Sequence, residues 1–177
     1  LDLDKTRKII WSHAKAYQVH KNTELVAVCD VNKVNYDSFN KHYPNIFFYN
    51  NYHNMMDKNQ IDIVSICVPT SEHLEIVKKL INHNIKALFI EKPMGQNIRE
   101  AEEISTLCKE KNIILAVNYM RRWENKYKVI KKIIDINEFG VLQSITAYGC
   151  TALLTSASHL IDLFLFYGGT VEWLIGS

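Results

Sequence analysis

Short apolar runs alternate with longer segments of helical periodicity along the first two thirds of the chain. Runs of strand length occupy 25–29, 46–49, 61–68, 86–90 and 113–117. Between them, apolar residues at helical spacing predict helices over 7–20, 33–42, 52–58, 71–83 and 98–111. This alternation indicates βαβ units, whose strands are parallel and whose helices cover both faces of the sheet. Because the crossovers of such units are right-handed, we expect an α/β fold with a doubly wound parallel sheet.

The alternation loosens after about residue 120. A basic amphipathic helix is predicted over 123–135, a strand over 141–148 and a helix over 159–166. We therefore expect a first domain over 1–120 and the beginning of a second, α+β domain over 121–177.

Composition and charge exclude several classes of protein. Hydrophobic residues make up 47% and charged residues 23% of the chain, which is typical of a globular protein. A net charge of +2 is too small for a nucleic-acid binder that works by bulk charge. The basic stretch 121–132 is interpreted as a solvated helix face, with a nucleic-acid surface as the less favoured alternative. No apolar run reaches the roughly 18 residues of a membrane span, and the first residues are not those of a signal peptide, so a cytoplasmic protein is expected.

Polar residues follow the predicted strands at the points where they end. They are Asp30, Pro69 with Thr70, Glu91-Lys92-Pro93, and Asn118 with Tyr119. Because ligands bind at the carboxyl ends of parallel strands, these residues mark a candidate site. An acid in the position of Asp30 binds the ribose hydroxyls of a dinucleotide, although Asp30 taken alone is more often a strand-end turn residue. Lys92 is either directed into the cleft by the neighbouring proline or an exposed loop lysine.

His159 and Asp162 are three residues apart and therefore share one face of a predicted helix. A histidine there can act as general acid or base, although a packed histidine is the commoner case. Five other histidines are interpreted as structural or surface residues: His13, His20, His42, His53 and His83. Since only the 159/162 pair is suggestive and no Cys-x-x-Cys occurs, we expect no metal site.

Taken together, the motifs resemble those of the Gfo/Idh/MocA family of NAD(P)-dependent oxidoreductases. The similar segments, in chain order, are 12–17, 24–30, 64–73, 91–94, 116–122 and 158–163. Glu91-Lys92-Pro93 matches the family's most specific signature. The resemblance implies a Rossmann-like fold and hydride transfer between a nicotinamide and a hydroxyl of a sugar, a cyclitol or a nucleotide-linked sugar.

By this resemblance Lys92 and His159 form the catalytic pair, with His159 taking the hydroxyl proton and Lys92 holding the same oxygen. The cofactor contacts would be Asp30, Pro69, Thr70, His73, Glu91, Lys92, Asn118 and Arg122. NAD is the expected cofactor because of Asp30, with NADP possible. The expected partners are a small sugar-like substrate and, at full length, further copies of the chain. Two alternatives remain: an NAD-assisted hydrolase or lyase of the same family, and a non-catalytic Rossmann module.

Three features depart from the family pattern. The first glycine is Gly95, so the family's first strand and glycine-rich turn are expected upstream of Leu1. Thr155 stands where many members carry an aspartate four residues before the catalytic histidine. The chain also ends soon after entering the second domain. We therefore expect a fragment that is inactive and that binds NAD weakly or not at all by itself, with neighbouring strands deprived of a central partner.

Overall fold

The computed structural model describes residues 10, 12–148 and 157–175. The strands are β1 (Ala27–Cys29), β2 (Phe47–Tyr49), β3 (Ile63–Ile66), β4 (Ala87–Ile90) and β5 (Ile114–Val117). The α-helices are α1 (His13–Val19), α2 (Lys33–His42), α3 (Tyr52–Lys58), α4 (His73–Leu80), α5 (Ile98–Glu110), α6 (Asn125–Asp135) and α7 (Ser158–Gly168). Two short 3₁₀ helices follow strands: η1 (Thr70–Glu72) and η2 (Met120–Trp123).

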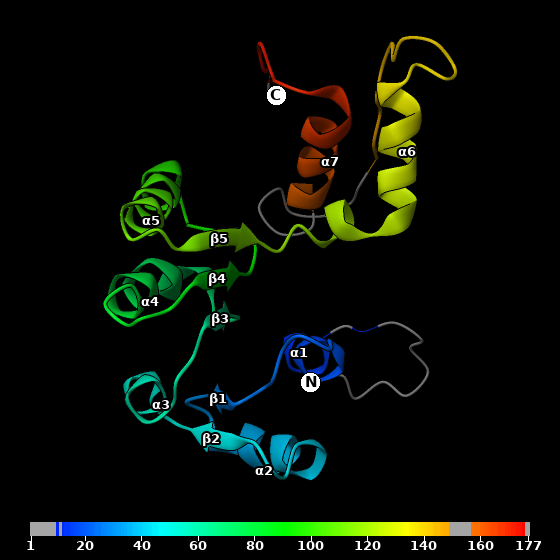
Figure 1. Ribbon diagram of the computed structural model, residues 1–177. Helices are drawn as coiled ribbons and strands as arrows, with labels where there is room; N and C mark the ends of the chain where they lie inside the picture. The colour runs from blue at the N-terminus through cyan, green and yellow to red at the C-terminus, as the bar shows by residue number, and fades with distance from the viewer. Residues whose placement is uncertain (1–9, 11, 149–156, 176–177) are drawn as a thin grey trace.

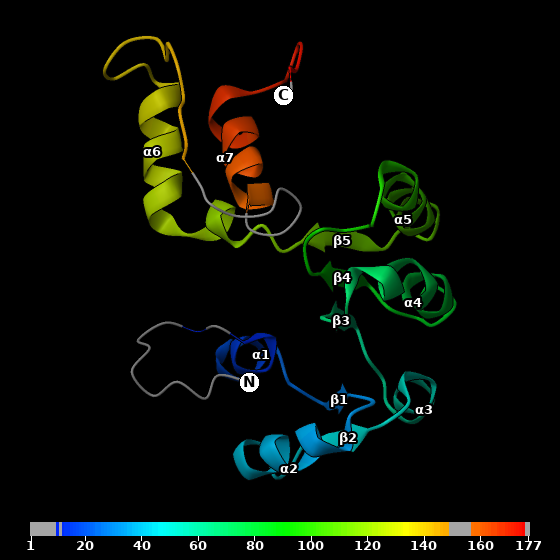
Figure 2. The same cartoon turned by 180° about the vertical axis from the view of Figure 1, so that it is seen from behind.

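All strand pairs in the described residues are parallel, which confirms the predicted α/β fold class. Strand β1 pairs with β2, and β4 lies between β3 and β5. Figures 1 and 2 show the strands in the spatial order β2, β1, β3, β4, β5, with a break between β1 and β3. These two strands are not ladder partners in the described part of the chain, which is where the sequence predicts that a central strand is lacking.

Helices α4 and α5 pack together and against β3, β4 and β5, and form the best-buried part of the molecule. Val77 of α4 and Ile104 of α5 are fully buried, and they belong to one core cluster with the buried Leu88 and Ile90 of β4. Along β4, buried and half-buried side chains alternate, because successive side chains of a strand point to opposite faces of the sheet. The core therefore fixes the position of the loop that follows Ile90.

Asparagine and serine side chains cap the N-termini of several helices. The side chains of Asn32, Asn51 and Asn97 accept hydrogen bonds from the first main-chain N–H groups of α2, α3 and α5. Glu100 reciprocates at α5, because its carboxylate accepts a bond from the main-chain N–H of Gln96. Such local caps explain why α2 and α3 have the bounds that the sequence predicts.

Other boundaries differ from the prediction. The predicted helix over 71–83 is divided into η1 and α4, and α4 ends at Leu80. Of the predicted helix over 7–20, the structure describes the part that begins at His13, since residues 1–9 and 11 lie outside the described residues. Thr155 lies outside them as well.

The predicted strand over 141–148 is wrong, because this segment has no regular secondary structure. A strand needs a ladder partner, and no other strand of the described residues lies against the segment. Its alternating apolar side chains are consequently exposed, Val141 at 70% and Tyr148 at 93%. The predicted division of the chain near residue 120 stays a prediction.

Candidate active site

Glu91 joins three elements at the carboxyl ends of the strands. One of its carboxylate oxygens, Oε1, accepts hydrogen bonds from Asn118 Nδ2, at 2.7 Å, and from His13 Nε2, at 2.9 Å. Its main-chain N–H donates to the carbonyl of Ile66, which extends the β3–β4 ladder by one step. Glu91 is therefore held by side chain and main chain directly before Lys92.

His13 and Glu91 carry opposite charges. Burial of the imidazole disfavours its charged form, but the neighbouring side chains of Cys67 and Glu91 raise the pKa of His13 to about 9. The hydrogen bond from His13 lowers the pKa of Glu91, and the amide of Asn118 acts in the same direction. Although burial opposes them, the pKa of Glu91 falls to about 2. At neutral pH the two side chains form a hydrogen-bonded ion pair.

His73 joins the two loops that follow β3 and β4. Its side chain is completely buried, with ring nitrogens 3.0 Å from the carbonyl oxygen of Val68 and 3.1 Å from that of Met94. The second loop contains the cis peptide bond between Lys92 and Pro93. A role of His73 in cofactor binding stays a prediction. Because its ring contacts main-chain carbonyls of both loops, such a role would be indirect, through the positions of these two loops.

An ion pair holds helix α7 against the end of β5. Arg122 Nε of η2 lies 2.8 and 2.9 Å from the two carboxylate oxygens of Asp162, and Nη2 donates to the Asp162 carbonyl at 3.3 Å. Asp162 is only 7% exposed, and the guanidinium also lies over the ring of Phe166. Arg122, predicted to contact the cofactor, therefore positions α7, and a cofactor contact by this residue remains untested.

His159, on the first turn of α7, lies near the loop that carries Lys92. Burial, followed by the positive charges of Lys92 and Arg121, lowers the pKa of His159. Its ring meets that of Tyr119 edge-on at 6.1 Å between centroids. Within the described residues, its buried Nδ1 has no hydrogen-bond partner. The imidazole is thus neutral at neutral pH.

The remaining predicted cofactor residues lie at the ends of β1 and β3. Asp30 accepts hydrogen bonds from the main-chain N–H of Asn32 and from the side-chain amide of Asn35, at 2.8 and 2.6 Å. This is the turn role that the sequence analysis left open, and a ribose contact stays a prediction. Pro69 is exposed and Thr70 half-buried at the beginning of η1.

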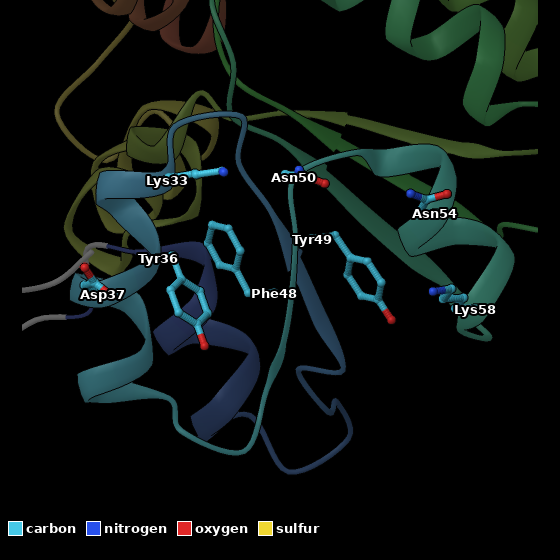
Figure 3. Close-up of a pocket in the computed structure, with 8 residues that line it drawn as sticks. All are labelled: Lys33, Tyr36, Asp37, Phe48, Tyr49, Asn50, Asn54 and Lys58. Atoms are coloured by element: carbon cyan, nitrogen blue, oxygen red, sulfur yellow. The ribbon is translucent and has the colours of Figure 1, made fainter.

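A separate hollow lies at the outer edge of β2, between α2 and α3 (Figure 3). It has a volume of about 540 Å³. Its lining residues are Lys33, Tyr36, Asp37, Phe48, Tyr49, Asn50, Asn54 and Lys58. Since none of the predicted site residues is among these, the hollow is distinct from the candidate active site.

The sequence analysis missed His13, which it interpreted as a structural or surface histidine. His13 bonds Ser65 and Glu91, which are 52 and 78 residues further along the chain. No local pattern could have shown these contacts. The only local indication was that His13 directly follows Ser12, whose side chain caps the N-terminus of α1.

The parallel sheet and its strand-end cluster define a Rossmann-type nucleotide-binding domain. Residues 8–119 match GFO_IDH_MocA, described as an oxidoreductase family with an NAD-binding Rossmann fold. The chain belongs to this family, as the sequence motifs predict.

Named relatives include inositol dehydrogenases. An uncharacterized oxidoreductase of Schizosaccharomyces pombe is 36% identical over 98 residues, or 55% of this chain and 26% of the relative. The scyllo-inositol 2-dehydrogenase (NAD(+)) of Bacillus subtilis is 38% identical over 80 residues, or 45% of this chain and 23% of the relative. A crystal structure of myo-inositol 2-dehydrogenase from Lactobacillus plantarum has a TM-score of 0.64 at 29% identity, and the match covers 70% of this chain and 37% of that one. The matched regions thus make up about a quarter of each of these two curated relatives.

Proposed function

We propose that this chain is the nucleotide-binding part of an NAD-dependent dehydrogenase that oxidises a ring hydroxyl of an inositol or a related polyol. Family membership and the inositol dehydrogenases among the relatives support the reaction class. The observation that carries the proposal is the proximity of His159 and Lys92, which come from α7 and from the loop after β4. The charge of Lys92 acts on the pKa of His159, so the two residues of the proposed acid–base pair lie in the same region, beside the carboxyl ends of the strands.

The strand ends fit a dinucleotide, since an acid stands at the end of β1 and a turn with a half-buried hydroxyl follows β3. Asp30 would bind the adenosine ribose and disfavour a 2′-phosphate, while Thr70 and Asn118 would lie along the cofactor. When bound, NAD supplies the hydride acceptor.

His159 and Lys92 would handle the proton of the substrate hydroxyl. Neutral His159 would accept that proton at a ring nitrogen, so the O–H bond breaks as an N–H bond forms. The ammonium of Lys92 stabilises the negative charge that develops on the oxygen. With the proton held by His159, bound NAD would accept the hydride of the carbinol carbon, and the alcohol would become a ketone.

The test is NADH formation by the protein purified from its complete gene, with scyllo-inositol, myo-inositol and other polyols as substrates. Lys92→Ala and His159→Ala are each expected to lower kcat/KM at least about a hundredfold. Lys86→Ala is the matched control, because this lysine is 73% exposed and pairs with Asp62. A preference for NAD over NADP that Asp30→Ala removes would support the role of Asp30.

Other outcomes contradict the proposal. Conversion of the polyol without net NADH would indicate the hydrolase or lyase alternative. NAD binding without turnover of any polyol, unaffected by Lys92→Ala, would indicate a non-catalytic module.

A further inference from the structure

His13 reaches the loop of Lys92 from helix α1, a different part of the fold. Its Nε2 lies 2.9 Å from the Glu91 carboxylate, and its Nδ1 lies 2.9 Å from Ser65 Oγ in β3. Its ring also packs against Phe89 of β4, with centroids 4.9 Å apart. The imidazole is thus fixed on three sides, and its side chain is only 18% exposed.

Two histidines brace the loop that carries Lys92. On one side of the lysine, His73 lies at hydrogen-bond distance from the carbonyl of Met94. On the other side, His13 bonds the carboxylate of Glu91, which Asn118 also holds. Among His13, His73 and Asn118, it is His13 that places a positive charge against the Glu91 carboxylate.

We propose that His13 is a positioning residue for Lys92: its imidazolium fixes the Glu91 carboxylate and thereby the placement of the lysine beside His159. The inference rests on the proposed function, because Lys92 is a catalytic residue only there. His13 acts through Glu91, and its effect therefore falls on the placement of the lysine ammonium.

The charge state of His13 makes this arrangement sensitive to pH. The groups that face it are the Glu91 carboxylate after β4, the Cys67 thiol after β3 and, through Ser65, the Tyr17 phenol of α1. Both ring nitrogens donate only when the imidazole is protonated. Loss of that proton, as the pH rises through about 9, removes the attraction for Glu91.

The first test needs no variant and no substrate. Histidine-labelled protein from the complete gene is titrated by NMR, and the His13 signal is expected to shift near pH 9. Titration of His13 near its ordinary value of 6.5 would show that the ion pair does not form, and would overturn the inference.

The second test follows Lys92 itself. With lysines reductively methylated with carbon-13, His13→Gln and Glu91→Gln are each expected to move the NMR signal of Lys92, which Lys92→Arg identifies. His53→Gln is the matched control, because His53 is exposed on α3 and is expected to leave that signal unchanged. An unmoved Lys92 signal in folded His13→Gln protein would contradict the inference.

Kinetics separate this inference from the proposed function. With NAD and scyllo-inositol, His13→Gln is expected to lower kcat about tenfold or more, with KM changed less than about twofold. The kcat of the wild type is expected to fall as pH rises through about 9, and His13→Gln is expected to lack this fall. If the wild type oxidises no polyol, the proposed function fails, whereas the two NMR tests still decide whether His13 positions Lys92.

Discussion

The Glu91 carboxylate carries the negative charge to which the polar side chains at the strand ends bind. It is 32% exposed, and hydrogen bonds from His13 and Asn118 keep it ionised despite partial burial. An ion pair this enclosed is less screened by salt than a surface pair. Its charge state should therefore affect both the stability of the fold and the placement of Lys92.

The free energy of unfolding is expected to depend on pH through this pair. The pKa of His13 rises from 6.5 to about 9 on folding, so its contribution is complete below 6.5 and is lost as pH rises through about 9. The pKa of Glu91 falls from 4.5 to about 2, so its contribution is complete above 4.5 and is lost as pH falls through about 2. The pair thus stabilises the fold most between 4.5 and 6.5.

Urea denaturation of the wild type and His13→Gln measures this effect. The difference in unfolding free energy is expected to be about 2 kcal/mol near pH 6 and to shrink toward about zero near pH 10. A difference that stays constant over this range would show that His13 stabilises by packing alone. His53→Gln controls for the general loss of a histidine.

At the scale of elements, the contact between η2 and α7 fixes the helix that carries His159. The two elements meet through Arg122 and the buried Asp162, and Tyr167 of α7 also donates to the Tyr127 carbonyl of α6. Removing one member of a buried pair leaves the other charge uncompensated.

Asp162→Asn is therefore expected to destabilise the protein by about 1–3 kcal/mol, less than for a fully buried pair because Arg122 is 36% exposed. Asp62→Asn is the matched control, since its pair with Lys86 is exposed and is expected to contribute less than about 1 kcal/mol. Thermal unfolding of both variants checks the comparison, and equal effects would contradict the assigned role of the Arg122–Asp162 pair.

Elements that depend on local sequence were predicted well. Elements and residues that depend on contacts far along the chain were predicted poorly. Helices α2 and α3 have their predicted bounds because their caps and periodicity lie within the helices and their first residues. The predicted strand over 141–148 is wrong because a strand depends on a partner elsewhere in the chain. His13 was missed for the same reason, since its partners belong to β3 and the end of β4. Lys92 could be predicted as a site residue because its neighbours in sequence form a specific motif, and its catalytic role stays a prediction.

At the scale of the whole molecule, the two sheets are unequally supported. Strands β3–β5 with helices α4 and α5 contribute most of the buried core. In β1 and β2, by contrast, each residue is half-buried or exposed. Figure 1 shows that the break in strand order falls between these two groups. Among the described residues, no helix is long and apolar enough to cross a membrane.

Unequal packing predicts unequal protection of backbone amides. Amides exchange through local openings, whose free energy rises with the apolar surface packed around them. We expect the amides of β4 to exchange at least about a hundredfold more slowly than those of β1 and β2, since Leu88 and Ile90 are almost completely buried whereas Phe47 is 65% exposed. Hydrogen exchange followed by NMR resolves the two groups. Uniform protection across β1–β5 would show instead that the two sheets unfold as one cooperative unit, and the split in the strand order would then have no energetic counterpart.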